Sequence, residues 1–468
     1  MTKSANETAS MSEWRFDRES IRAFRFVRTE FDAERGVARL VYAFDDGPDL
    51  VETITFPGAP FVLDTARSEA VQRALRLLHG IAGVSYYKAA VPPQILIEGE
   101  GIDADTAALL TEIYENGLGE FAYRNGLKLR GKIRFPHVES SGATAAALGL
   151  RHHAIVAIGG GKDSLVSIEA LRSAGVAQTV TWIGSSPLIA SCAARTGLPT
   201  LNIERKLAPQ LFEYNRQGAY NGHIPVTAIN STILVLAALL HDADQVVFSN
   251  ERSASYGSEI LDDDGRVVAE VNHQWSKGWA FERAFGAYVE RRVAPELHYY
   301  SLLRPLSELA VARQFAKTDR YDAHFSSCNR NFHILGERPV NRWCGQCPKC
   351  HFVFLALAPF MPKPRLLNIF GRNLLDDASL APGFDALIEY RDHKPFECVG
   401  EGREARAVFA ALALRTAWRE DALVARFAQE IQPLLGADLD SIDDLLPPSG
   451  EHRIPSALWS TLRAHFAA

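Results

Sequence analysis

The chain has 468 residues, 47% of them hydrophobic and 23% charged, which is the composition of an ordinary soluble globular protein. At about 150 residues per domain, this length predicts two or three domains. The net charge of −6 argues against a general nucleic-acid binder, because such proteins carry a broad basic surface.

The N-terminal segment and the most apolar segment both favour the cytoplasm as the location. Residues 1–14 are polar and mixed in charge, without the apolar core of a secretory signal. Residues 224–240 are the most apolar stretch, but Thr227 and Asn230 interrupt them and His241 follows directly. They predict a buried core helix rather than a membrane span, which needs about 20 apolar residues. No membrane insertion is expected.

Residues 1–145 are predicted to form an N-terminal α+β domain with a role in substrate binding. Runs of alternating β-branched and aromatic residues indicate strands, and apolar residues at helical spacing indicate helices. The predicted strands are 24–31, 37–44 and 51–56, the first two joined as a hairpin, and the predicted helices are 68–81 and 103–117. A small-residue stretch, 140–150, is interpreted as the linker. Candidates for contacts with anionic groups are Arg124, Lys132 and Arg134.

From Ala154 onward, short apolar runs alternate with helical segments, which favours a parallel sheet with helices on both faces. The predicted strands are 154–158, 179–183, 200–203 and 245–248, and the predicted helices are 165–174, 188–196 and 228–240. We therefore expect an α/β fold, with an α/β domain over 146–360. Residues 361–468 are predicted to form a mostly helical C-terminal region.

A glycine-rich loop follows the first of these strands and opens a helix. Its residues are Gly159, Gly160, Gly161, Lys162, Asp163 and Ser164. Glycines let the backbone approach an anion closely, and a helix N-terminus offers free N–H groups and a favourable dipole. Lys162 adds a mobile positive charge and Ser164 a hydroxyl donor, while Asp163 caps the helix or helps to hold a magnesium ion. The loop thus predicts a phosphate site; the alternative is a turn that only joins strand to helix.

Four of the six cysteines lie close together in the sequence and predict a closed metal site. They are Cys328, Cys344, Cys347 and Cys350, with the spacing C-x15-C-x2-C-x2-C. Each C-x2-C step can place two thiolates around one metal, which favours structural zinc. An iron–sulfur cluster held by the same four thiolates is the alternative to zinc. Unligated buried cysteines are the third possibility.

Three polar segments are candidates for substrate contacts: 214–223, 249–253 and 272–277. In open parallel sheets, ligands bind beyond the carboxyl ends of the strands. Asn250 and Glu251 follow a predicted strand and are therefore expected at the nucleotide. The alternative is that these segments are hydrophilic loops without a ligand.

The glycine-rich loop resembles the S-G-G-x-D-S signature of the PP-loop ATP pyrophosphatases, with Gly159 where that family usually has Ser. Residues 224–225 with Asn230, and residues 304–310, are similar to segments of the nitrile-forming deazaguanine branch of that family. A similar cysteine pattern holds structural zinc in that branch. The resemblance implies a PP-loop core that binds ATP and Mg²⁺, with Asn230 near the nucleotide.

Over nearly its full length the chain resembles the UDP-N-acetylmuramoyl-L-alanyl-L-glutamate epimerases. The segments that carry this resemblance are 121–124, 131–136, 159–164, 221–228, 249–255, 272–276, 343–350 and 394–400. The resemblance implies an enzyme of peptidoglycan precursor synthesis that takes a UDP-N-acetylmuramoyl dipeptide. It implies adenylation of the glutamate carboxylate, inversion of the neighbouring carbon, and release of AMP and pyrophosphate. Lys162 and Mg²⁺ would neutralise charge on the phosphates.

Two residues are candidates for moving the proton. His223 titrates near neutral pH and lies in a polar segment, and Cys398 offers a thiol whose pKa the protein can lower. An ordinary structural role is the alternative for each.

Three other functions remain open from the sequence. They are another PP-loop adenylating enzyme, such as an amide- or nitrile-forming ligase, an RNA-modifying thiolase, and a non-catalytic nucleotide-binding module. The negative charge and the commitment of four cysteines to a metal weigh against the thiolase. No nucleic-acid partner is expected, and the sequence makes no prediction of the oligomeric state.

Overall fold

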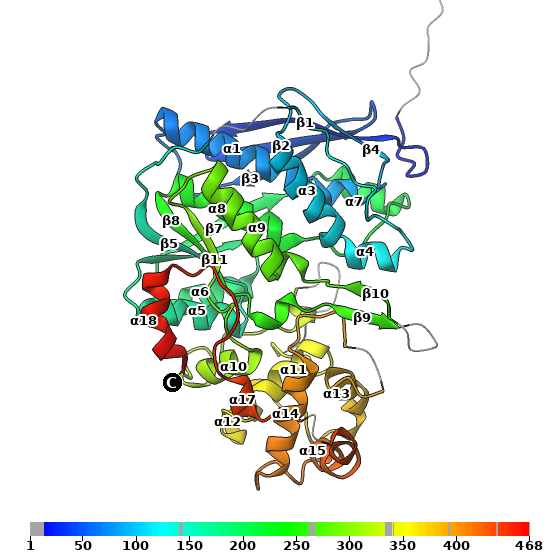
Figure 1. Cartoon of the computed structure of the whole chain (residues 1–468), viewed down its shortest axis with the longest axis vertical. Coiled ribbons are helices and arrows are strands. Elements are labelled where there is room, and N and C mark those ends of the chain that lie inside the picture. Colours follow the sequence, from blue (N-terminus) through cyan, green and yellow to red (C-terminus); the bar gives the residue numbers. More distant parts are fainter. Residues whose placement is uncertain are drawn as a thin grey trace, which may run out of the picture.

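One nine-stranded sheet runs through the upper two thirds of the molecule (Figure 1). Helices of the C-terminal region form the lower end of the molecule. The order of the strands in the sheet is β11-β8-β5-β6-β7-β3-β2-β1-β4. The structure is a computed structural model that describes residues 14–139, 144–261, 267–332, 339, 341–391, 394–436 and 439–467. Part of the predicted linker, residues 140–143, lies outside the described residues.

Five parallel strands form one half of this sheet and confirm the predicted α/β class. They are β5 (Arg151–Ala157), β6 (Gln178–Ile183), β7 (Thr200–Lys206), β8 (Ala243–Phe248) and β11 (His298–Ser301). The helices between them are α5 (Lys162–Ser173), α6 (Pro187–Thr196), α7 (Gln210–Arg216), α8 (Val226–Leu240) and α9 (Trp279–Arg292). All four predicted strands of this half are present, with ends shifted by a few residues; β11 was not predicted.

Helices cover both faces of the parallel half, because side chains of a strand alternate between the two faces. On β5, Ala154 and Val156 pack into the hydrophobic cluster that includes α5 and α6, while Ile155 packs into the cluster that includes α8 and α9. The apolar segment 224–240 is thus a buried core helix. Within the described residues, no helix is both long enough and apolar enough to cross a membrane.

The other half of the sheet belongs to the N-terminal region and makes the whole sheet mixed. Its strands are β1 (Ala23–Asp32), β2 (Val37–Phe44), β3 (Leu50–Thr55) and β4 (Gln94–Ile97). The hairpin and the third strand confirm the prediction, whereas β4, which pairs with β1, was missed. Its helices are α1 (Thr65–Ala82), α2 (Val84–Tyr87), α3 (Ala104–Gly117) and α4 (Gly119–Arg124). The predicted helices 68–81 and 103–117 correspond to α1 and α3.

The two halves join where β3 pairs antiparallel with β7. A buried ion pair crosses this junction, with 2.7 Å between Arg205 Nε and Glu52 Oε1. The glutamate is fully buried, so removing the arginine alone would leave an uncompensated charge in the core. The sheet is therefore continuous from one region into the next, and the division at residue 145 stays a prediction.

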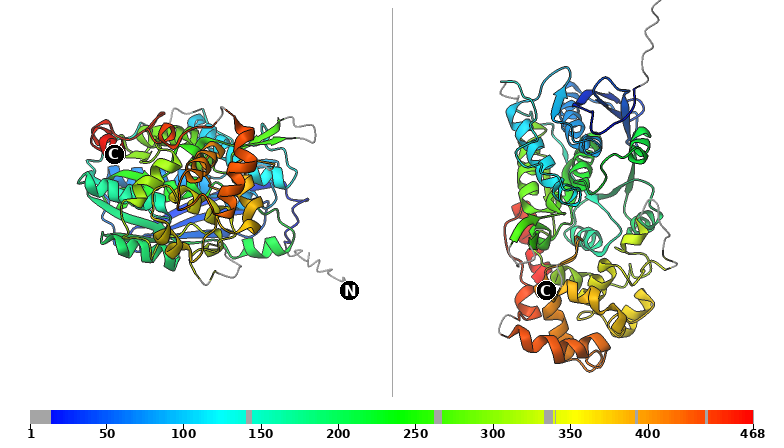
Figure 2. Two further views of the ribbon diagram at one scale, coloured as in Figure 1. Left: turned by 90° about the horizontal axis from the view of Figure 1, so that it is seen from below. Right: turned by 90° about the vertical axis from the view of Figure 1, so that its right-hand side faces the viewer.

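The C-terminal region is helical, as predicted, and packs below the parallel half (Figure 2). The helices from residue 308 onward are α10 (Glu308–Ala316), α11 (Pro348–Leu357), α12 (Lys363–Phe370), α13 (Ala381–Leu387), α14 (Gly402–Ala413), α15 (Ala422–Arg426), α16 (Gln432–Leu435), α17 (Ile442–Leu445) and α18 (Ser456–Ala467). Helix α18 returns to α10, where Arg313 and Gln314 donate to the carbonyl oxygen of Phe466 at 2.9 and 3.1 Å.

Short single-turn elements and one hairpin complete the fold. They are η1 (Arg252–Ser255), η2 (Trp275–Lys277), η3 (Asn329–Asn331), η4 (Ala378–Leu380), the π-helical η5 (Phe427–Ile431), and the hairpin β9 (Ser258–Leu261) and β10 (Val267–Val271).

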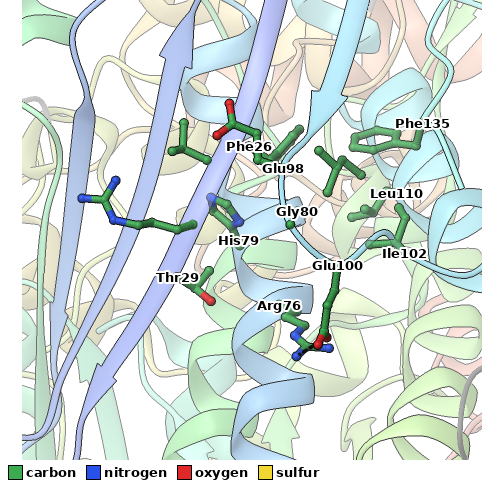
Figure 3. A pocket seen from close by; sticks show the side chains of 14 residues that line it. Phe26, Thr29, Arg76, His79, Gly80, Glu98, Glu100, Ile102, Leu110 and Phe135 are labelled. Atoms are coloured by element: carbon green, nitrogen blue, oxygen red, sulfur yellow. Dashed lines mark ion pairs between the residues drawn. The ribbon is translucent and has the colours of Figure 1, made fainter.

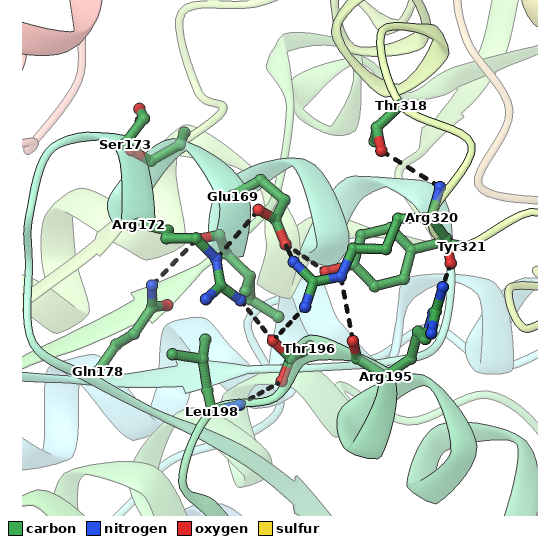
Figure 4. A network of polar contacts seen from close by, with 12 residues as sticks. Glu169, Arg172, Ser173, Gln178, Arg195, Thr196, Leu198, Thr318, Arg320 and Tyr321 are labelled. Carbon is green, nitrogen blue, oxygen red and sulfur yellow. Dashed lines mark hydrogen bonds and ion pairs between the residues drawn. The ribbon is translucent and has the colours of Figure 1, made fainter.

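A polar network fastens α5 to α6 on the lower face of the sheet (Figure 4). Arg172 and Arg320 donate to the carbonyl oxygen of Thr196 at 2.6 and 2.8 Å, at the C-terminal end of α6. Glu169 on α5 accepts from both arginines and from the hydroxyl of Tyr321. Two guanidinium groups at a helix C-terminus also complement the helix dipole. The network fixes the helix that the glycine-rich loop opens.

A cavity of about 220 Å³ lies in the N-terminal region between β1, α1 and α3 (Figure 3). His79 on α1 lies in its wall, 8% exposed, and its Nε2 is 2.9 Å from the carbonyl oxygen of Val41. Burial lowers the pKa of His79 to about 4. Since that nitrogen faces a carbonyl, it carries the proton of a neutral ring, and Nδ1 is left as an acceptor.

We expect His79→Gln to reduce the dependence of the unfolding free energy on pH. Between pH 6.5 and about 4 the unfolded chain binds a proton at this histidine and the folded chain does not, so stability falls as pH falls. Over this window the loss amounts to about 3 kcal/mol. Glutamine can still donate to Val41 but does not titrate. Denaturant unfolding at several pH values checks this, and an unchanged pH slope in the variant would contradict it.

Candidate active site

The glycine-rich loop connects the end of β5 to the start of α5, as predicted. Gly160 has a φ of +80°, and a Cβ there would lie 2.5 Å from Leu188 Cδ2, so the turn requires glycine. A Cβ on Gly159 would meet nothing within 4 Å. The hydroxyl of Ser164 lies 3.4 Å from the Gly159 N–H and donates to the carbonyl of Gly161 at 3.2 Å. The loop therefore has the open, N–H-rich form that suits an anion.

The structure corrects part of what was predicted for the two charged residues of the loop. Gly161 is the N-cap of α5 and no side chain caps this helix, so capping, one of the two roles predicted for Asp163, is wrong, whereas a role in holding Mg²⁺ stays a prediction. Lys162 is only 2% exposed and is not a mobile surface charge. Its ammonium lies 2.5 Å from Asp163 Oδ1 and also contacts Glu308 at the start of α10.

Glu308 is the ion-pair partner that offsets the free-energy cost of burying the Lys162 ammonium. Both Lys162 and Glu308 are almost fully buried, and the carboxylate approaches the ammonium within the core below the loop. Burial raises the pKa of Glu308 well above its usual value, and the charge of Lys162 opposes that shift. The first residue of α5, directly after the glycine turn, thus carries a buried ammonium held between two carboxylates.

The structure places the other predicted nucleotide residues at the same edge of the sheet. Asn250 and Glu251 follow β8, the strand beside β5, and Asn230 lies in the second turn of α8. Asn250 donates to Ser301 Oγ at 3.0 Å, while the amide of Asn230 has no hydrogen-bond partner within the part of the chain that the structure describes. Glu251 caps η1 by accepting from the N–H of Ala254 at 3.1 Å. Asn230 is therefore the freest of the three for a ligand.

Both candidates for proton transfer lie in one cluster with three further residues. Lys277 Nζ donates to Cys398 Sγ at 3.0 Å, and His273 Nε2 is 4.0 Å from that sulfur. The rings of His223 and His273 are 6.1 Å apart between centroids. Glu120 of α4 completes the set, with Oε2 3.8 Å from His223 Nδ1. Residues 121 apart in sequence, Lys277 and Cys398, are thus direct neighbours.

Charge and burial set the protonation of this cluster. Burial is the largest single influence on the pKa of Cys398 and raises it, but the charges of Lys277 and Lys349 and the hydrogen bond from Lys277 together lower the pKa of this thiol. Burial lowers the pKa of His273 to about 4, with the charge of Lys277 as a second cause. Burial also lowers the pKa of His223, and the carboxylate of Glu120 opposes that shift. Lys277 therefore favours the thiolate form of Cys398, and burial favours the neutral form of both imidazoles.

The cluster lies close to the phosphate loop. The pKa of Lys277 is raised, chiefly by Cys398 and also by the carboxylates of Glu251 and Asp163. The carboxylate of Asp163 in the loop thus acts electrostatically on the ammonium that faces the thiol.

Residues 394–400 bring Cys398 to the cluster from the C-terminal region. The ring of Phe396 lies 6.1 Å from Tyr123 and 6.4 Å from His273 between centroids, with the guanidinium of Arg124 5.5 Å from its centre. Arg124 is thus occupied beside the cluster. On the other side, Glu397 accepts from Asn329 at 2.6 Å. The segment is held between α4 and the cysteine-rich part of the chain.

We expect Lys277→Met to slow alkylation of Cys398 at pH 7 by roughly tenfold, because the thiolate loses its neighbouring cation. Iodoacetamide labelling followed by mass spectrometry measures the rate at each cysteine as pH varies. Burial raises the pKa of the Cys192 thiol to about 12, which makes it the unreactive internal reference. Lys394→Met is the matched control, since Lys394 makes no hydrogen bond to the thiol. Equal labelling in both variants would exclude Lys277 as the cause of the lowered pKa.

The four predicted cysteines lie together, with all four Sγ atoms within 4.8 Å of one another. The sulfur of Cys350 is 3.7 Å from that of Cys344 and 3.4 Å from that of Cys347, which is 4.0 Å from Cys328. Four thiolates at 2.3 Å from one tetrahedral ion lie about 3.8 Å apart. The N–H of Gln346 points at Cys344 Sγ at 3.4 Å. The arrangement fits one tetrahedral metal ion.

This cysteine cluster also supports the phosphate loop. Cys328 is fully buried, and its N–H donates to Ser326 Oγ at 3.0 Å. The N–H of Ser326 donates to the carbonyl oxygen of Gly160 at 2.9 Å. A Cβ on Gly161 would lie 3.2 Å from Ser327 Oγ. The segment that the cysteines anchor therefore packs directly against the loop.

The sequence matches the two domains of one known protein family. Residues 15–302 match the MurL N-terminal domain, and residues 324–441 match the MurL C-terminal domain. The chain belongs to the MurL family. The loop, His223, His273 and Lys277 all lie in the first matched domain, and Cys398 lies in the second.

Three proteins similar to this chain carry the same name. A UDP-N-acetyl-alpha-D-muramoyl-L-alanyl-L-glutamate epimerase of Xanthomonas oryzae pv. oryzae is 71% identical over 452 residues, 97% of this chain and 99% of that protein. A protein of the same name from Micromonospora sp. is 41% identical and covers 92% of this chain and 96% of its own length. Another, from Salinispora tropica, is 42% identical and covers 86% of this chain and 87% of its own length. The predicted family is confirmed, and the chain is an epimerase, an enzyme of the isomerase class.

Sequence reasoning missed three residues of this site. His273 and Lys277 lie in a segment that was named only for its polarity, and Glu120 was not singled out. Glu308 lies in the segment 304–310, but its pairing with Lys162 was not foreseen. A signal for Lys277 existed in principle, because a lysine in a short polar segment next to a predicted ligand edge is a candidate partner for a low-pKa thiol.

Proposed function

We propose that the chain inverts the terminal L-glutamate of UDP-N-acetylmuramoyl-L-alanyl-L-glutamate to D-glutamate, in cytoplasmic synthesis of peptidoglycan precursors. ATP would adenylate the glutamate α-carboxylate, with release of pyrophosphate and later of AMP. The names of the relatives support the substrate. The observation that carries the mechanism is the Lys277–Cys398 pair beside the phosphate loop.

Adenylation makes the inversion feasible. Removing a proton next to a free carboxylate would add negative charge beside an existing anion. An acyl-adenylate has lost that charge, so its α-proton is more acidic. The carboxylate oxygen attacks the α-phosphorus of ATP and the bond to pyrophosphate breaks. After inversion, water attacks the acyl carbon, AMP leaves, and the free carboxylate is restored.

The cluster supplies the two proton carriers. The thiolate of Cys398 removes the α-proton of the L-residue, and the hydrogen bond and charge of Lys277 favour this ionised form against the effect of burial. His223 approaches from a different segment and returns the proton; the carboxylate of Glu120, 3.8 Å from its Nδ1, opposes the burial that otherwise disfavours the protonated imidazole. His273 lies between the two and, as a neutral ring, can relay a hydrogen bond.

The loop residues bind and orient ATP. The N–H groups of Gly159–Gly161 and the start of α5 face the phosphates, Lys162 lies beneath them, and Asn230 lies near the nucleotide. A Mg²⁺ ion, when bound, supplies further neutralisation of phosphate charge, with Asp163 as its candidate ligand because that side chain is 37% exposed.

We propose that the four cysteines hold structural Zn²⁺, with an iron–sulfur cluster as the alternative. Purified protein should contain about one zinc per chain by elemental analysis and no iron absorption in the visible range. Cys347→Ser should lower the zinc content and the melting temperature together, since the metal anchors the segment against the loop. Iron at a higher ratio than zinc would favour the cluster.

The test of the function is incubation of the purified protein with ATP, Mg²⁺ and the UDP-linked dipeptide, followed by chiral analysis of the glutamate. We expect D-glutamate with one AMP and one pyrophosphate for each turnover. Neither D-glutamate nor AMP would refute the proposal. AMP formation that requires ammonia, with an amide or nitrile as product, would point to the ligase reaction instead.

A further inference from the structure

A basic pocket of about 510 Å³ lies between the N-terminal strand region and the loop 127–132. Its lining combines Arg18, Arg22, Lys128 and Lys132 with the aromatic residues Tyr87 and Tyr220. This volume is within the range of sites that hold nucleotide-sized ligands. No residue of the phosphate loop or of the acid–base cluster lines it, so it is a separate site.

Most of the cations in this pocket have no ion-pair partner among the described residues. Arg18 pairs with Glu19 at 2.9 Å and lies over the ring of Tyr220. The side chains of Arg22, Lys128 and Lys132 form no ion pair with any described residue. By contrast, the cations around the cavity of Figure 3 are paired, as Arg76 is with Glu100 at 2.7 Å. Three unpaired cations converging on one pocket predict an anionic ligand.

A neighbouring pocket of about 750 Å³ extends from the basic pocket to Asn272, in the segment that carries His273. Lys128 lines both pockets, and Tyr123, Asn272 and Trp275 line the second one. Asn272 directly precedes His273 of the cluster. Tyr220, which lines the basic pocket, also lies three residues before His223 of the cluster in the sequence. A long ligand could therefore lie with one end in the basic pocket and the other at the thiolate.

We infer that this basic pocket binds the uridine diphosphate end of the substrate, with Lys128 and Lys132 on the diphosphate and the sugar–peptide part leading through the second pocket to Cys398. The inference rests on the proposed function for the nature of the ligand. A diphosphate carries the charge that the unpaired cations require, and lysines bind phosphate as compact point charges. The acid–base cluster would then bind the glutamate end of the substrate.

Binding of free UDP to the purified protein, measured by calorimetry without ATP, tests the assignment. We expect Lys128→Gln with Lys132→Gln to weaken UDP binding at least about tenfold. Lys206→Gln is the matched control, because Lys206 is 67% exposed and pairs only with the nearby Glu204. It should bind UDP like the wild type. In turnover, the double variant should raise the KM for the UDP-linked dipeptide by a similar factor and leave kcat unchanged.

The outcomes separate this inference from the proposed function. Wild-type protein that does not bind UDP, or a double variant that binds it normally, overturns the pocket assignment even when D-glutamate is formed. Loss of UDP binding in the double variant supports the pocket even when the wild type forms no D-glutamate. A dipeptide substrate without the nucleotide should show the same KM in wild type and double variant, and a raised KM there would also overturn the assignment.

Discussion

Cys398→Ser should abolish the incorporation of solvent deuterium at the α-carbon of the substrate glutamate, with a loss of inversion of roughly a thousandfold or more. A serine hydroxyl has nearly the same shape but does not ionise beside Lys277, so the group that removes the proton is gone. Exchange of labelled pyrophosphate into ATP should stay within about twofold, because in the proposed mechanism adenylation uses the loop and not the thiol. Mass spectrometry of the recovered glutamate in D₂O measures the incorporation.

His223→Gln is the informative comparison for that experiment. If Cys398 removes the proton and His223 returns one from another direction, this variant should still incorporate deuterium but with retention of the L-configuration. Chiral analysis separates retention from inversion. Full incorporation in Cys398→Ser would remove Cys398 from the mechanism, and inversion at the normal rate in His223→Gln would remove His223.

Lys162→Met should have the second large effect, on both stability and ATP use. Glu308 would keep a buried carboxyl group without its cation, which costs about 3–5 kcal/mol of unfolding free energy. The exchange of pyrophosphate into ATP should fall by about two to three orders of magnitude, because the positive charge below the phosphates is lost. Denaturant unfolding and pyrophosphate exchange measure the two effects separately.

The double variant Lys162→Met with Glu308→Leu separates the structural role from the functional one. Replacing a buried ion pair by apolar side chains often restores stability, so most of the unfolding free energy should return. ATP use should remain low if Lys162 acts on the phosphates. A double variant that regains both stability and pyrophosphate exchange would show that Lys162 serves only as the partner of Glu308.

The elements that could be predicted from the sequence are those that local patterns determine. Alternation and helical spacing located β2 and α3 almost to the residue, because each element must bury one face. The spacing of Cys344, Cys347 and Cys350 likewise reports a geometry set within seven residues. The loop at Gly159–Ser164 was found for the same reason, since a strand, a turn and a helix start follow directly in the chain.

The parts that could not be predicted depend on contacts between distant segments. The pairing of β3 with β7 joins residues about 150 apart, and no local pattern encodes it. The partner of Lys162 lies 146 residues away at Glu308, which made a mobile charge the natural reading of that lysine. Cys398 was singled out from a family resemblance, while its partner Lys277 lies in a segment with no distinctive periodicity.

The origin of Cys398 in the second matched domain has a consequence for the newly made chain. During synthesis, the strands, the phosphate loop, His223 and Lys277 all emerge before residue 398 does. A chain that stops short of this point would carry the loop without the thiolate. Under the proposed mechanism, any carboxylate that such a fragment activated would be hydrolysed unchanged, and each event would consume an ATP without producing a D-residue. Under this mechanism, inversion of the glutamate requires that translation continue through the C-terminal region.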